Sequence, residues 1–232
     1  PLFVALALLL IVLLLRSQWD ELSRHEWRLN LGWLAVSGLF LLASWAVEVQ
    51  IWRRLLRVLG GSLPYGPAVR IWFLSAIVRY IPGNIWQPLS MTLLAQRRGV
   101  APEATLTSVV LYQLLNLLAA TPIAAVYLLA TGNWGLLTGV LGPWTPYLAG
   151  VVLAPIVIFL VRPSWLIELV NWLLVKLRRT PLAADLTRPV MATVIAMTIG
   201  DWLLWGSAFA ALAFALQPYP VDAMVRLVPH LV

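Results

Sequence analysis

Long apolar segments separated by short charged stretches dominate the chain. Residues 2–15 are apolar without interruption, and longer segments of this kind cover 31–52, 102–130, 147–161 and 190–216. A helix needs about 20 apolar residues to cross a bilayer. The longer segments therefore predict membrane-spanning helices, and 2–15 predicts the remainder of a spanning helix whose beginning is missing. The pattern as a whole predicts an all-α fold, a polytopic helical bundle embedded in a membrane.

A polar break interrupts residues 65–96, which are too many for one straight span. Pro82 and Gly83 stand near the centre, where proline lacks an N–H and glycine disfavours a helix. Asn84 and Gln87 have the spacing of a capping box, so a second helix is expected to begin directly after Asn84. Broken backbone at membrane depth is tolerated only against protein or a watery cavity. We therefore predict a re-entrant hairpin that enters and leaves the membrane by one face.

Residues 164–179 carry a different pattern. Ser164, Glu168, Asn171 and Arg178 lie on one narrow stripe of a helix that is otherwise apolar, and basic residues stand at its end. Such an amphipathic helix is typical of the membrane interface, where its polar stripe faces water. The alternative is a spanning helix that is too short to cross.

Composition supports a membrane protein. Hydrophobic residues make up 62% of the 232 residues and charged residues 11%, against about half and a quarter in soluble domains. The net charge is +7, but most basic residues stand in short loops beside apolar segments. There they set topology and contact lipid headgroups rather than nucleic acid. A re-entrant hairpin at 65–96 gathers more of them on one face than a full crossing, as the positive-inside rule favours.

Catalytic and metal-binding patterns are missing from the sequence. Cysteine is absent, which excludes disulfides, thiolate metal sites and a cysteine nucleophile. The two histidines, His25 and His230, flank the apolar body of the chain, and no glycine-rich phosphate loop follows a strand. We therefore expect no cofactor, no metal site and no catalytic residues, and we expect that the chain is not an enzyme.

Several polar side chains fall inside the predicted membrane segments. Glu48, Arg79 and Asp201 are ionisable, and each costs at least about 2.5–3.5 kcal/mol in a span. Asn116 belongs to a polar arc on the helix 102–130 together with Thr105, Ser108 and Tyr112, and Gln113 lies beside this arc. One interpretation is structural, with Arg79 paired to one of the carboxylates as a buried ion pair. The other is a polar cavity in which Arg79 binds the phosphate of a charged headgroup.

A motif at the break resembles a known family. The chain reads Arg79-Tyr80-Ile81-Pro82-Gly83-Asn84-Ile85-Trp86-Gln87 and continues to Gln96-Arg97-Arg98-Gly99-Val100. This resembles the flippase-like transmembrane family related to the membrane half of lysylphosphatidylglycerol synthase, the multiple peptide resistance factor. That family shows R-Y-x-P-G-x-x-W-Q, then R-R-x-G-V, then S-V-x-x-E. Ser108-Val109 matches the third element, but Tyr112 stands where many members have glutamate, which bears on a preference for cationic headgroups.

The resemblance implies a polytopic α-helical protein with re-entrant segments that moves phospholipids or lipid-linked sugars between membrane leaflets. The motif residues and the polar side chains of the spanning helices are then the candidate substrate-binding residues: Arg79, Tyr80, Pro82, Gly83, Asn84, Trp86, Gln87, Gln113, Asn116, Glu48 and Asp201.

Residues 1–232 are predicted to form a single transmembrane domain, truncated at both ends, in the plasma membrane of a bacterium or an archaeon. Small residues in the last span suit close packing, either within one chain or in a homo-oligomer. Two other functions stay open. One is a non-transporting membrane subunit that scaffolds a glycosyltransferase or a lipid-modifying enzyme. The other is an intramembrane enzyme that acts on lipid-linked sugars.

Overall fold

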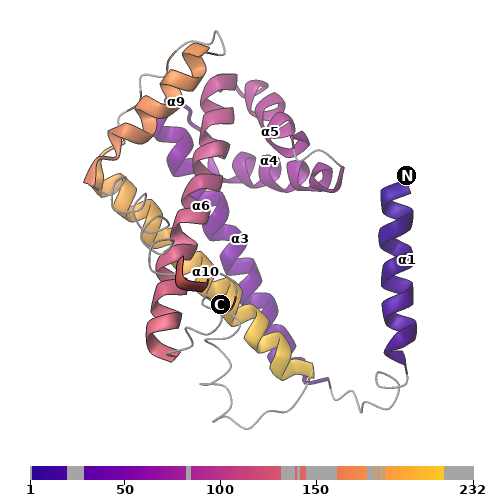
Figure 1. The fold of residues 1–232 in the computed structure, drawn as a ribbon. Coiled ribbons are helices and arrows are strands. Elements are labelled where there is room, and N and C mark those ends of the chain that lie inside the picture. Colours follow the sequence, from indigo (N-terminus) through magenta and orange to yellow (C-terminus); the bar gives the residue numbers. More distant parts are fainter. Residues whose placement is uncertain are drawn as a thin grey trace.

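The structure, a computed structural model, is built of helices in the part of the chain that it describes (Figure 1). The described residues are 2–19, 29–81, 85–131, 139, 142–144, 161–176, 181, 184 and 186–216. The elements are α1 (Leu2–Ser17), α3 (Leu31–Val58), α4 (Tyr65–Ile77), η1 (Val78–Tyr80), α5 (Trp86–Gln96), α6 (Pro102–Thr131), η2 (Gly142–Trp144), α9 (Ser164–Lys176) and α10 (Arg188–Leu216). The predicted all-α fold is confirmed. The span predicted at 147–161 lies outside the described residues, except for Val161.

Three helices of the described residues are long and apolar enough to cross a membrane: Leu31–Val58, Pro102–Ala120 and Arg188–Leu216. The first and the last, α3 and α10, lie side by side along much of their length (Figure 1). Asn30 joins their ends, because its side chain accepts hydrogen bonds from the first turn of α3 while its own N–H donates to the Ala215 carbonyl at 2.8 Å. These two candidate spans are thus tied to each other at one end as well as along their length.

Small side chains allow α10 to lie close to α3. Gly206, Ala208, Ala210 and Ala211 are all buried, and Ser37 of α3 donates to the Ala208 carbonyl at 2.8 Å. Packing within one chain therefore accounts for these small residues.

The helix α3 is longer than the sequence pattern predicted. The predicted span ends at Trp52, but the helix continues to Val58. Arg53 fits inside the helix because its guanidinium donates to the Leu63 carbonyl at 3.0 and 2.9 Å and to Gln50 Oε1 at 2.7 Å. The charge is thus satisfied by neighbouring polar atoms, and the helix does not need to stop there.

The predicted helix–break–helix at 65–96 is present as α4, η1 and α5. The helices α4 and α5 lie beside each other and run across the direction of α3 and α6 (Figure 1), with Ser75 Oγ and Ser90 Oγ 3.2 Å apart between them. The helix α5 begins at Trp86 with Ile85 as its N-cap, one position later than expected. Asn84 lies outside the described residues, so the capping box stays a prediction. Insertion of this hairpin into a membrane stays a prediction.

A hydrophobic core lies where the hairpin and α6 meet the second half of α3. It includes fully buried side chains from each of these elements: Trp52, Leu55, Leu56, Met91, Leu111 and Leu115. The Trp52 indole donates to Ser108 Oγ at 2.9 Å. This core fixes the hairpin against the spanning helices.

Glycine has a defined role in the turn between α5 and α6. Gly99 has φ of 80°, a conformation that other residues adopt only with strain. The next residue, Val100, is buried and lies close to Gly61, where an added Cβ would be 3.0 Å from Val100 Cγ1 and 2.8 Å from Leu56 Cγ. The Arg97-Arg98-Gly99-Val100 segment thus reverses the chain and closes it against the loop after α3.

The helix predicted at 164–179 is present as α9 over its described part, 164–176. Leu166, Ile167 and Leu174 are buried, whereas Trp165 and Trp172 are exposed. The two tryptophans carry cations over their rings, from Arg162 at 5.3 Å and Lys176 at 4.0 Å. Its location in the membrane interface stays a prediction.

Candidate functional site

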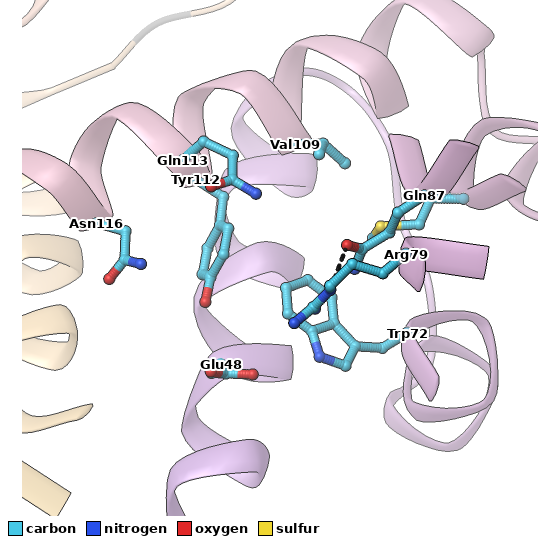
Figure 2. A pocket seen from close by; sticks show the side chains of 9 residues that line it. Glu48, Trp72, Arg79, Gln87, Val109, Tyr112, Gln113 and Asn116 are labelled. Carbon is cyan, nitrogen blue, oxygen red and sulfur yellow. Dashed lines mark hydrogen bonds between the residues drawn. The ribbon is translucent and has the colours of Figure 1, made fainter. Parts of the chain in front are cut away.

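A polar cavity of about 290 Å³ lies where α3, the α4–α5 hairpin and α6 meet (Figure 2). Its lining is mostly polar or aromatic: Glu48, Trp72, Arg79, Gln87, Met91, Val109, Tyr112, Gln113 and Asn116. Five of these residues are candidates from the sequence, and they come from four different elements. The fold thus brings together side chains that are up to 68 positions apart (48 to 116).

Arg79 and Gln87 face each other across the break in the hairpin. Arg79 Nε donates to Gln87 Oε1 at 2.9 Å (Figure 2). Gln87 is in the first turn of α5 and is buried, while Arg79 is the middle residue of the short η1 helix and stays accessible. This bond uses one nitrogen of the guanidinium and turns the side chain toward the cavity, which leaves its two Nη groups available for an anion.

Glu48 supplies the acidic side of the cavity. It lies near the middle of α3, and the Trp205 indole of α10 donates to its Oε1 at 3.4 Å. The Tyr112 side chain extends from α6 toward Glu48 (Figure 2). Tyr112 also meets Trp72 edge to face, with ring centroids 5.1 Å apart. These two rings, both members of the hydrophobic core, therefore form an aromatic side of the cavity.

Gln113 and Asn116 complete the polar wall on α6. They lie about one helical turn apart and therefore share a face of the helix. Both side chains carry an acceptor and a donor of hydrogen bonds. They offer the neutral polar groups that a hydroxyl or a phosphate ester can contact.

The structure does not show the ion pair that the structural interpretation required. Among the described residues, Arg79 bonds to Gln87 and not to a carboxylate. Asp201 is buried, with 3% of its surface exposed, and accepts a hydrogen bond from Ser44 Oγ at 2.5 Å. It lies outside the cavity lining and joins α10 to α3.

The other candidates from the sequence do not line this cavity in the described part of the chain. Tyr80 ends η1, but its side chain lies outside the described residues, as do Pro82, Gly83 and Asn84 entirely. Trp86 borders a separate groove on the other side of α5.

Four residues that line the cavity were not among the candidates from the sequence. Trp72, Met91 and Val109 lie in apolar helices and carry no signal that separates a cavity wall from a core. Tyr112 was visible as a member of the polar arc on α6 and as a departure from the family motif. Its place beside Glu48 depends on how α6 packs against α3, which the sequence does not show.

The arrangement combines one cation, one carboxylic acid and three amides with aromatic walls. Such a set suits a small, charged group that also makes hydrogen bonds. Within the described ranges, no three histidine, aspartate or glutamate side chains gather as metal ligands do.

Comparison with known proteins adds a family. A family model described as the lysylphosphatidylglycerol synthase TM region matches residues 2–229. No curated protein and no solved structure matches the chain. The match covers nearly the whole sequence and includes every cavity residue.

Proposed function

The chain belongs to the family of the lysylphosphatidylglycerol synthase transmembrane region, and we propose that it is a lipid flippase or scramblase. In this proposal the headgroup of a phospholipid or a lipid-linked sugar passes through the cavity at Arg79 while its acyl chains stay in the bilayer. The proposal places the protein in the plasma membrane of a bacterium or an archaeon and assigns it transport without a chemical reaction or a cofactor.

The observation that supports this proposal is the polar cavity among membrane-spanning helices. Glu48 stands on α3 and Gln113 and Asn116 on α6, both candidate spans. An ionisable side chain inside a span costs at least about 2.5–3.5 kcal/mol, and such residues commonly mark a substrate pathway. Arg79 and Glu48 do not neutralise each other as an ion pair in the described structure. A ligand that carries its own charges would therefore find partners for both.

The geometry gives each part of a headgroup a partner. The two Nη groups of Arg79 bind a phosphate. The first turn of α5 lies beside it, and its N-cap residue Ile85 makes no side-chain cap, so its backbone dipoles favour an anion there. Gln113 and Asn116 contact glycerol or sugar hydroxyls, and Glu48 meets an ammonium group or balances Arg79 when the cavity is empty.

Leaflet exchange of fluorescent phospholipids in proteoliposomes tests the proposal. We expect exchange by the wild-type protein and its loss in Arg79→Ala. Arg70→Ala is the matched control, because Arg70 is an exposed arginine on the same hairpin and lies outside the cavity lining. Equal exchange in the two variants would contradict a role of the cavity in transport.

The scaffold function is favoured by one surface. The α9 helix exposes Trp165, Leu169 and Trp172 on one side, and such aromatic surface suits a partner such as a glycosyltransferase or a lipid-modifying enzyme. This alternative predicts co-purification with that enzyme, and it predicts no exchange of any lipid by the folded protein alone.

A further inference from the structure

A second cavity lies on the opposite side of the hairpin from the polar one. It is an apolar groove of about 350 Å³, lined by side chains from η1 and α5 with one arginine: Val78, Ile81, Leu89, Leu93, Leu94 and Arg97. Ile81, Leu89 and Leu93 are 46–52% exposed. Large apolar side chains that stay this open need an apolar neighbour, either lipid or protein.

The groove is apolar along its length and charged at one end. Three side chains that line it carry a polar group, namely Arg97, Ser90 and the indole of Trp86. Ser90 Oγ is turned toward Ser75 Oγ at 3.2 Å. Arg97 follows the last residue of α5, and its guanidinium has no partner among the described residues. An apolar groove that ends at one accessible cation is complementary to a molecule with an acyl chain and a phosphate.

The length of the groove suits one acyl chain. The groove follows α5, which has 11 residues and therefore a length of about 16 Å. The hydrocarbon core of a bilayer is about 30 Å thick, so one leaflet contributes about 15 Å. The groove along α5 is therefore about as long as one extended acyl chain, and Arg97 stands at its end.

We infer that the outer face of the hairpin binds one phospholipid, with its phosphate on Arg97 and one acyl chain along the groove. The lipid belongs to the leaflet that the hairpin enters. This site is distinct from the polar cavity, because Arg79 and Gln87 line that cavity and not the groove. The inference requires the hairpin to be in the membrane, but it does not require transport.

Photo-crosslinking tests the site. The probe is a phosphatidylglycerol with a diazirine in the middle of one acyl chain, and its control is a diacylglycerol with the same chain and no phosphate. The purified protein is labelled in a phosphate-free detergent, and the labelled peptides are identified by mass spectrometry. The variants are Arg97→Gln, the matched control Arg98→Gln on the adjacent exposed arginine, which does not line the groove, and Leu93→Trp, which fills the groove from an exposed position.

We expect phosphatidylglycerol to label α5 about fivefold more than diacylglycerol, the ratio that a charge-assisted contact of about 1 kcal/mol produces. Arg97→Gln abolishes this difference, Arg98→Gln keeps it, and Leu93→Trp lowers labelling of α5 by both probes. Equal labelling by the two lipids, or a preference that survives Arg97→Gln, would overturn the inference.

The cavity variant separates this site from the proposed transport. Arg79→Ala is expected to keep the labelling of α5 while losing leaflet exchange. If the groove is not a lipid site, exchange still depends on Arg79. If transport is absent, the labelling pattern still depends on Arg97.

Discussion

The contact between Ser44 and Asp201 gives a sharp test of the packing between α3 and α10. Asp201 is 3% exposed and receives its hydrogen bond from Ser44 at 2.5 Å. Ser44→Ala leaves the buried carboxyl group without this partner, and such a loss costs about 1–3 kcal/mol. Ser37→Ala is the matched control, because Ser37 lies on the same face and donates only to a backbone carbonyl at 2.8 Å. A bond of that kind between membrane helices contributes about 0.6 kcal/mol on average.

The assay is reversible unfolding of the purified protein in mixed micelles of detergent and SDS. We expect Ser44→Ala to lower the free energy of unfolding by about 1–3 kcal/mol and Ser37→Ala by less than about 1 kcal/mol. Asp201→Asn retains an acceptor for Ser44, so its loss in the free energy of unfolding should lie between the losses of the two serine variants. Equal small losses in both serine variants would refute the argument, because they would show that the Asp201 carboxyl does not depend on Ser44.

Three further substitutions test the core, the turn and the cavity. Trp52→Phe removes the indole N–H that donates to Ser108 Oγ in a fully buried hydrogen bond of 2.9 Å. This variant should lower the free energy of unfolding by about 1–3 kcal/mol in the same assay, and an unchanged free energy would contradict the bond. Gly99→Ala places a side chain at φ of 80° and should lower stability by about 1–2 kcal/mol, and a neutral result would refute the turn. Gln87→Glu puts a carboxylate 2.9 Å from Arg79 Nε, so the arginine is neutralised and exchange of anionic lipids should fall; unchanged exchange would show that Arg79 does not bind the phosphate.

Hydropathy predicted the helices well because spanning segments are set by a property that sums over many residues. The last span was expected at 190–216 and is found at Arg188–Leu216. The break in the hairpin was visible because proline and glycine act locally. The end of α3 could not be predicted in this way, because Arg53 donates to the Leu63 carbonyl, which lies beyond the helix itself.

The cavity was only partly predictable for the same reason. Arg79, Gln87 and Glu48 were recognisable as polar groups in apolar surroundings. Which carboxylate lies near Arg79 depends on the rotation of whole helices, and this rotation turns Glu48 toward the cavity and Asp201 toward Ser44. A helical pattern gives the face of each helix but not its neighbour. For this reason the sequence left the ion pair and the cavity as alternatives.

The central claim is that a lipid headgroup occupies the polar cavity, and labelling of a single cysteine tests it most directly. The chain contains no cysteine, so Asn116→Cys introduces a single reactive thiol in the cavity wall. Leu117→Cys is the control, because Leu117 is the next residue of α6 and is 72% exposed. Each variant is reconstituted with a phosphatidylethanolamine whose amine carries a maleimide. Our account predicts labelling at position 116 that is lost when Arg79→Ala is added, and little labelling at position 117. Equal labelling at both positions, or labelling at 116 that ignores Arg79, would contradict it.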